Sequence, residues 1–254
     1  MRVPHWAWVL PLVVGLAASA ARAEEFVVID SSGSDSPIGT VFAPGAVVTV
    51  PDHGRLVLLG ASGQVVPLTG PFEGVPSSNA AGSANNRVFA AIASLVRSDQ
   101  KETSPGAVRS TEDPRIASIK WRIDSAKTLT DVLAIDTSNG GETCLYDLTS
   151  VRLMRKPSNR PSKVTIHDRY GSALAAIPWP QDAASLPWPA QVPIADGQSY
   201  LIELEGQSEL IKTKIHLLRE SSSASSVERV AQLADSGCKV QARLLLILLA
   251  TTSK

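Results

Sequence analysis

Short apolar runs separated by glycine- and proline-containing turns constrain the fold of this chain most strongly. Between residues 26 and 72, runs of four to six mainly β-branched and aliphatic residues are broken by turns every eight to ten positions. The runs are 26–29, 39–42, 47–50, 55–59 and 64–68. Strands of this length with this spacing of breakers are typical of all-β folds. We therefore expect residues 24–75 to form a small β-meander or barrel-like domain.

A second series of short apolar runs fills residues 116–219. The predicted strands are 119–123, 130–135, 144–146, 151–154, 163–167, 172–177, 200–204 and 210–217. Residues 168–171 separate two of these strands and predict a hairpin turn. Seven or so strands in about 100 residues are typical of a β-sandwich made of two sheets. The antibody spacing Cys…Trp…Cys does not occur, so we expect a sandwich that is Ig-like in architecture only.

Helical periodicity appears before and after the predicted sandwich. Within the helix-and-linker region 76–115, an apolar stripe predicts a short amphipathic helix, followed by an exposed linker over 98–114. The stripe consists of Val88, Phe89, Ile92, Leu95 and Val96. The predicted fold is therefore mainly β, with short amphipathic helices in the linker and at the C-terminus.

The C-terminal segment 220–254 predicts two helices after a serine-rich joint. Ser225 and Glu228 have the spacing of a capping box at the start of the first helix. Residues 241–249 form a very apolar second helix that is too short to span a bilayer. We expect this helix to be buried against the sandwich.

Residues 1–23 have the three parts of a cleavable secretory signal peptide. Arg2 supplies positive charge, residues 9–20 are nearly all apolar, and Ala21 and Ala23 place small residues at −3 and −1. The apolar stretch is about a dozen residues long, whereas a spanning helix needs about 20, which disfavours the alternative of an uncleaved anchor. We expect cleavage after Ala23, a periplasmic or secreted protein, and no stable membrane span afterwards.

The charge balance excludes several classes of partner. Cleavage removes Arg2 and Arg22 and leaves 22 basic residues against 24 acidic ones, a net charge of about −2. Nucleic-acid binding requires a basic face that neutralises phosphates, and anionic membranes attract polybasic segments. We therefore expect neither nucleic acid nor a charged membrane surface as a partner.

Cys144 and Cys238 are the two cysteines of the chain and lie 94 positions apart. In an oxidising compartment an even pair predicts one disulfide, which would fix the C-terminal helix to the sandwich. No histidine cluster lies near them in the sequence, so they do not predict a zinc site. The alternatives are two free thiols or bonds to other chains, because a sequence does not show whether two sulfur atoms meet.

Motifs of catalysis are missing from the sequence. The stretch Gly60-Ala61-Ser62-Gly63 is one residue short of a nucleophile elbow and joins two predicted strands. There is no phosphate-binding glycine loop, no His-Glu-x-x-His and no acidic calcium loop. We therefore expect no enzymatic activity, no cofactor and no metal site.

Two similar tetrapeptides stand out, Ile-Pro-Trp-Pro around Trp179 and Leu-Pro-Trp-Pro around Trp188. One interpretation is that proline ends sheet pairing there while each tryptophan packs at the rim of the core, and we favour it because tryptophan usually supplies core area. The other interpretation is an exposed aromatic surface that binds a ligand. Trp179 and Trp188 are the candidate binding residues in that case.

The segment 39–71 resembles the β domain of FecR-type periplasmic proteins. The resemblance rests on Gly39-Thr40-Val41-Phe42-Ala43-Pro44-Gly45, on the strands 47–50 and 55–59, and on Gly63-Gln64-Val65-Val66-Pro67-Leu68-Thr69-Gly70-Pro71. These motifs lie within the predicted domain 24–75, and the resemblance covers about 50 residues. The family includes sensors that relay the occupancy of outer-membrane receptors and exported β modules that stand alone. We do not expect the cytoplasmic helical domain or internal membrane span of the sensors here, so the resemblance implies an exported binding or scaffold role.

These observations leave three functional hypotheses in order of preference. The first is a non-enzymatic, FecR-like periplasmic protein that engages another envelope protein as a scaffold or sensing module. The second is a soluble module for a small ligand or a glycan, and the third is a hydrolase.

Overall fold

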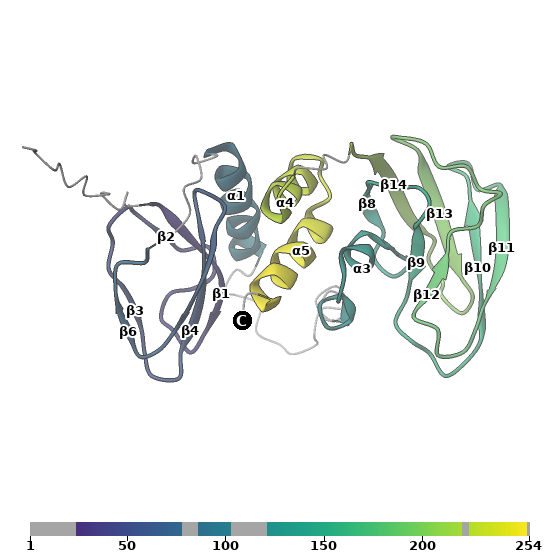
Figure 1. The fold of residues 1–254 in the computed structure, drawn as a ribbon. Coiled ribbons are helices and arrows are strands. Elements are labelled where there is room, and N and C mark those ends of the chain that lie inside the picture. Colours follow the sequence, from purple (N-terminus) through teal and green to yellow (C-terminus); the bar gives the residue numbers. More distant parts are fainter. Residues whose placement is uncertain (1–23, 78–85, 103–120, 220–223, 253–254) are drawn as a thin grey trace, which may run out of the picture.

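The N-terminal β module is an open antiparallel sheet with the strand order β2-β1-β4-β5, covered on one side by the ribbon β3-β6 (Figure 1). This computed structural model describes residues 24–77, 86–102, 121–219 and 224–252. The predicted signal peptide 1–23 and most of the predicted linker 98–114 lie outside these residues. The strands are β1 Phe26–Ser32, β2 Val41–Phe42, β3 Val48–Val50, β4 Arg55–Gly60, β5 Val65–Thr69 and β6 Phe72–Gly74.

The central strands β1 and β4 are buried on both faces. Alternate residues on one face, such as Val28 and Leu58, pack against Val48 and Val50 of the ribbon. Residues on the other face belong to a second core that contains helices. They are Val27, Ile29, Val57 and Leu59. Burial on both faces explains why these strands are continuous apolar runs rather than alternating ones, and each buried aliphatic side chain contributes about 1.5–3 kcal/mol.

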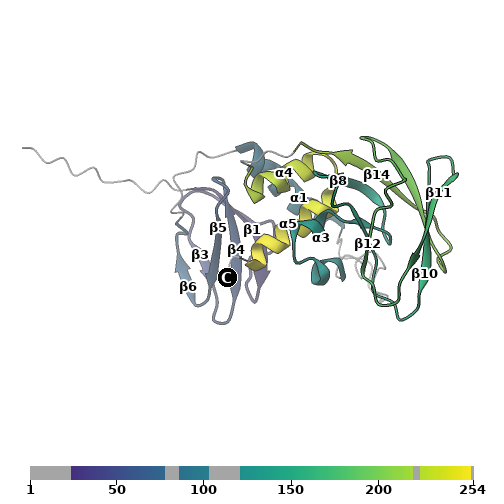
Figure 2. The same cartoon turned by 45° about the vertical axis from the view of Figure 1, so that its right-hand side comes forward.

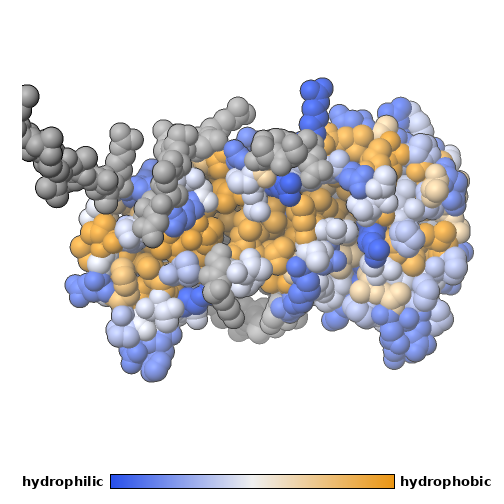
Figure 3. All heavy atoms as spheres, viewed as in Figure 1, coloured by the Kyte–Doolittle hydropathy of each residue, from blue (hydrophilic) through white to orange (hydrophobic). Residues whose placement is uncertain are grey.

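The helical layer consists of α1 Asn86–Glu102, α4 Ser226–Asp235 and α5 Lys239–Thr252. Both ribbon views place these helices between the N-terminal β module and the strands that follow it in sequence (Figures 1 and 2). On one face of the molecule, apolar side chains gather at the surface over this middle region (Figure 3). The predicted amphipathic helix is confirmed, with its stripe residues Phe89, Ile92, Leu95 and Val96 buried in the shared core. The helix continues to Glu102, so the first residues of the predicted linker 98–114 are helical rather than part of a linker.

The second C-terminal helix, α5, contacts more of the molecule than expected. The start of α5 contacts the C-terminal β module, which is formed by residues 135–217. The helix also packs against α1, α4 and the N-terminal sheet. At its far end, the Arg55 guanidinium donates a hydrogen bond of 2.9 Å to the Ala250 carbonyl and another of 3.1 Å to the Asp30 carboxylate. The helix has 14 residues and a length of about 20 Å, so it connects the two β modules.

The C-terminal β module pairs a five-stranded sheet, ordered β11-β10-β13-β14-β8, with a three-stranded sheet, ordered β12-β9-β7. Their strands are β7 Ile135–Asp136, β8 Gly141–Leu145, β9 Arg152–Met154, β10 Ser162–His167, β11 Ala173–Trp179, β12 Ser185–Pro187, β13 Ser199–Leu204 and β14 Ile211–Leu217. Most pairs are antiparallel, whereas β14 with β8 and β7 with β9 are parallel. The mainly β fold predicted from the sequence is confirmed.

Two predicted strands are helical in the structure. Residues 121–125 form a helix, and 130–135 are divided between α3 Leu129–Leu133 and the short β7. Thr128 caps α3 in a capping box with Asp131. The buried Arg122 guanidinium donates 2.9 Å and 3.3 Å hydrogen bonds to the carbonyls of Asp131 and Ala134. The Asp131 carbonyl also accepts a 3.4 Å hydrogen bond from the N–H of Ala134, the C-cap residue of α3. Arg122 therefore adds side-chain hydrogen bonds at the end of a helical turn that five residues of apolar alternation could not predict.

Candidate interaction site

The cysteines that are distant in sequence meet in the structure. Cys144 of β8 and Cys238, directly before α5, form a disulfide with their Cα atoms 5.9 Å apart. The Gln241 side chain lies beside it, where its Oε1 accepts 2.7 Å from the Cys144 N–H and its Nε2 donates 3.2 Å to the Cys144 carbonyl. Because β8 is the last strand of its sheet, Gln241 and the disulfide close that edge.

The two candidate tryptophans lie in the core of the C-terminal β module. Trp179 is fully buried, and its Nε1 donates 2.8 Å to the Ala183 carbonyl. Trp188 is half-buried, donates 2.9 Å to the Val192 carbonyl, and packs edge-on against Tyr200 at 5.2 Å between ring centroids. Rings enclosed in this way support the packing interpretation, because an aromatic ligand surface requires exposed ring faces.

The turn between β10 and β11 is held by a network of short-range hydrogen bonds. The Asp168 Oδ1 accepts from the N–H groups of Tyr170 at 2.8 Å and Ser172 at 2.9 Å. The Asp168 N–H donates 2.9 Å to the Ser172 carbonyl, and the Gly171 N–H donates 3.1 Å to the Asp168 carbonyl. Gly171 has φ = 90°, which an L side chain rarely adopts. The hydrogen bonds that the Asp168 carboxylate accepts, led by that from Ser172, lower the pKa of Asp168. Together with the backbone hydrogen bonds they hold the turn in place.

This turn presents an exposed aromatic side chain. Tyr170 is 77% exposed, and the Arg169 guanidinium carbon lies 4.6 Å from the centroid of its ring. Leu174, near the start of β11, is 39% exposed. We call Arg169, Tyr170 and Leu174 the hairpin tip. The hairpin tip lies at one edge of the five-stranded sheet, because β11 is an edge strand. The opposite edge is β8, which Gln241 and the disulfide close.

His167, the last residue of β10, contacts both the hairpin turn and the neighbouring strand β13. The His167 Nε2 lies 2.9 Å from the Glu203 Oε2 on β13, and its Nδ1 lies 3.1 Å from the Gly171 carbonyl. The ring therefore joins the turn to the neighbouring strand. It stabilises the position from which Arg169 and Tyr170 project.

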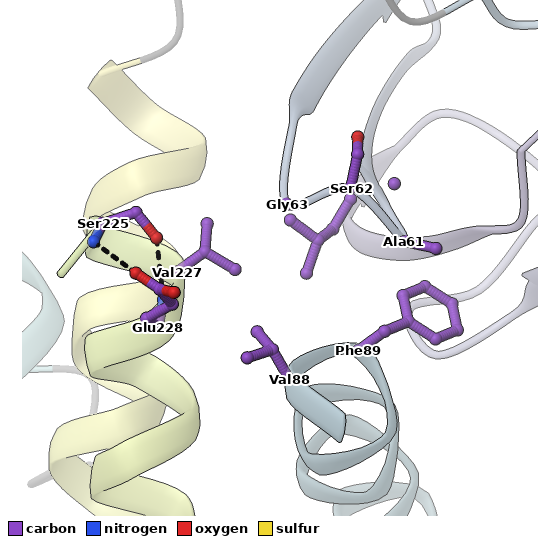
Figure 4. Close-up of a pocket in the computed structure, with 10 residues that line it drawn as sticks. Ala61, Ser62, Gly63, Val88, Phe89, Ser225, Val227 and Glu228 are labelled. Atoms are coloured by element: carbon purple, nitrogen blue, oxygen red, sulfur yellow. Dashed lines mark hydrogen bonds between the residues drawn. The ribbon is translucent and has the colours of Figure 1, made fainter. Parts of the chain in front are cut away.

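A pocket of about 250 Å³ lies where the β4–β5 turn meets the starts of α1 and α4 (Figure 4). Its wall is largely apolar, with Val88, Phe89 and Val227 opposite the turn. The polar groups of Ser225 and Glu228 bond each other's backbone in the predicted capping box, at 2.7 Å and 3.2 Å. The pocket is therefore a small apolar recess whose carboxylate already has partners.

Ser62, from the stretch considered as a nucleophile elbow, lies in this pocket wall. The structure places it on a turn between two strands rather than between a strand and a helix. Its hydroxyl is buried without a hydrogen-bond partner, and its N–H donates to the Glu24 carboxylate. No histidine lines the pocket, and the one lining carboxylate, Glu228, accepts a hydrogen bond from the Ser225 N–H rather than from this hydroxyl.

In the segments that the structure describes, no three His, Cys, Asp or Glu side chains are grouped closely enough to hold a metal ion. Within the same segments, no helix has both the length and the apolarity needed to cross a bilayer. Comparisons of the chain with known protein families, curated proteins and solved structures found no match.

The sequence predicted the hairpin turn but not the hairpin tip as a site. A tyrosine in a predicted turn can be buried or exposed, and which of the two holds for Tyr170 follows only from the packing around the turn. The stretch Asp168-Arg169-Tyr170-Gly171 nevertheless contained the usable signal, since it places arginine and tyrosine between two strong turn residues.

Proposed function

We propose that the mature protein is an exported, non-enzymatic, FecR-like component of the cell envelope that binds another envelope protein through the hairpin tip. The export signal in residues 1–23 and the disulfide between Cys144 and Cys238 support an oxidising compartment such as the periplasm. The resemblance of segment 39–71 to FecR-type domains supports a scaffold or sensing role rather than catalysis.

The exposure of Tyr170 on a rigid turn is the observation that carries this proposal. Tyrosine and arginine, together with tryptophan, are the residue types enriched among those that dominate interface energies. Tyr170 and Arg169 are both already ordered by their mutual stacking and by the hydrogen bonds of Asp168. A partner would therefore lose little conformational entropy in ordering them, which raises affinity for a given contact area.

The arrangement of sheet edges supports the same surface. Gln241 and the disulfide close the β8 edge, whereas β11 is the outermost strand at the other end of the sheet. Pro178 lies near the end of β11 and limits continued strand pairing there. Binding is therefore expected to centre on the side chains of the hairpin tip rather than on addition of a full strand.

The connection of both β modules through α5 supports a scaffold role. One end of this helix is bonded to β8 and the other to Arg55 of β4, so a contact at the hairpin tip acts on one connected body. The N-terminal β module would be held at a set distance from the bound partner.

Site-specific photo-crosslinking in the native periplasm tests the proposal. A photoreactive phenylalanine analogue replaces Tyr170 in the full chain, and Leu210 carries the same analogue in the control. Leu210 is 50% exposed and lies before β14, outside the hairpin tip. We expect a discrete protein adduct from position 170 that weakens when Arg169→Ala is added. Absence of an adduct at 170, or the same adducts from both positions, would contradict the proposal.

A further inference from the structure

A second recess lies at the other end of the β10–β11 hairpin from the tip. It has a volume of about 480 Å³ and is formed by the β9–β10 loop and the β13–β14 turn. We call it the basic pocket; its charged lining residues are Arg155, Lys156, Arg160 and Glu205, and its hydroxyl residues include Ser158 and Ser162. Its volume falls in the range of about 300–1,000 Å³ that is usual for small-molecule sites.

Arg155 is the least exposed charge of the basic pocket, with only 4% of its surface accessible. Its guanidinium stacks 4.8 Å from the Trp179 ring centroid, donates to the Ser162 hydroxyl, and donates 3.1 Å to the Pro180 carbonyl. Its Nε has no hydrogen-bond partner, and no carboxylate forms an ion pair with it among the described residues. Burial lowers the pKa of Arg155, although a guanidinium remains charged at neutral pH.

The positive charge of Arg155 is therefore incompletely compensated, because its neighbours are neutral hydrogen-bond acceptors and an aromatic ring rather than a carboxylate. The lining adds the exposed cations Lys156 and Arg160 and offsets them with one carboxylate, Glu205. Three positive charges against one negative leave a net charge of about +2 in a protein whose mature net charge is about −2. The positive potential is therefore a local property of this recess.

We propose that the basic pocket binds a small anion that carries a phosphate or carboxylate group. Lys156 and Arg160 contact the anionic oxygens, the Ser158 hydroxyl offers a further donor, and Arg155 contributes its charge from the floor of the pocket. Charge-assisted hydrogen bonds from lysine, arginine and hydroxyl groups are the usual means by which proteins hold both oxyanions. This site is separate from the hairpin tip, and the proposal does not depend on the proposed protein partner.

Calorimetric titration of the mature chain with pyrophosphate and with citrate, at constant ionic strength, tests the proposal. We expect one-site saturation by at least one probe, and the preferred probe identifies the ligand as a phosphate or a carboxylate compound. The double variant Lys156→Gln/Arg160→Gln should weaken binding about tenfold or more, because two charge-assisted contacts are lost. Both residues are exposed, so the variant should melt like the parent.

Two further variants make the test specific. Lys212→Gln/Lys239→Gln removes the same amount of charge at exposed positions outside the pocket and should change the affinity less than about twofold. Glu205→Gln removes the competing carboxylate and should strengthen binding several-fold. Failure of both probes to saturate at about 10 mM, or equal weakening by the two double variants, would overturn the proposal.

Discussion

The side chain of Gln241 hydrogen-bonds both the N–H and the carbonyl of Cys144, at 2.7 Å and 3.2 Å, and so takes the place of the next strand. A sheet edge without a partner leaves backbone groups unsatisfied and open to pairing with another chain. Here a single amide from α5 satisfies them at the same residue that forms the disulfide. The hydrogen bonds and the covalent bond therefore hold α5 against β8 at one point.

Replacing Gln241 by Ala should lower the free energy of unfolding by about 1–3 kcal/mol, because the buried N–H of Cys144 loses its acceptor. Urea denaturation of the oxidised protein measures the change. Gln191→Ala, at an exposed position, is the matched control and should stay within about 0.5 kcal/mol of the parent. Equal stability of the two variants would show that Gln241 does not support the edge of β8.

Cys144 and Cys238 should be recovered as one intramolecular disulfide. Peptide mapping of non-reduced periplasmic protein by mass spectrometry detects the cross-linked pair, whereas two alkylatable thiols or a linked dimer would contradict it. The bond closes a segment of 94 residues, and the chain-entropy model gives about 4–5 kcal/mol for a loop of this size. The variant Cys144→Ala/Cys238→Ala should be less stable by up to this amount in the same denaturation experiment.

Trp179→Ala should destabilise the protein by about 3–5 kcal/mol, because the fully buried indole leaves a cavity beside Arg155. Trp188→Ala should cost less, since Trp188 is half-buried. Thermal melting ranks the two against Tyr170→Ala, whose side chain is exposed and whose loss should change stability by no more than about 0.5 kcal/mol. If both tryptophan variants melt like the parent and lose a ligand instead, the aromatic-surface interpretation is correct.

The carboxylate of Glu142 should make stability depend on acid pH. Its hydrogen bond with His216 is the main cause that lowers the pKa of Glu142, and Lys214 adds to the effect at 3.7 Å. Because folding lowers this pKa, the stabilisation is complete above the ordinary value of 4.5 and is lost as the pH falls through the lowered value. Glu142 is 41% exposed, so screening limits the contribution to about 0.5 kcal/mol.

Denaturation at pH 7 and pH 3 checks this dependence. Glu142→Gln should be slightly less stable than the parent at pH 7, and this difference should shrink at pH 3. Glu209→Gln, at an exposed position near β14, should show no difference at either pH. A Glu142→Gln deficit of the same size at both pH values would contradict an ionic origin.

Cleavage of the signal peptide should occur after Ala23. N-terminal sequencing of protein recovered from the periplasmic fraction should begin at Glu24. A chain in that fraction that still begins at Met1 would contradict this prediction.

Local features of the fold could be predicted from sequence because their causes are local. The apolar runs around Val28 and Leu58 predicted strands, and the stripe from Phe89 to Val96 predicted α1. Ser225 and Glu228 form the expected capping box at the start of α4. The Asp168–Gly171 turn formed where its residue types required one, although no local pattern predicted the exposure of Tyr170 on it.

The sequence by itself thus determined most of the strand runs, three helices and the hairpin turn, because periodicity, capping and turn chemistry act within a few residues. Tertiary structure alone decided that α5 lies between two β modules, where Gln241 meets Cys144 across 97 positions. It also decided that Arg122 stabilises helical turns in place of predicted strands, and that Trp179 is enclosed beside Arg155. These outcomes depend on which distant surfaces exclude water together and which buried polar groups find partners there, and neither is encoded in any short stretch of the chain.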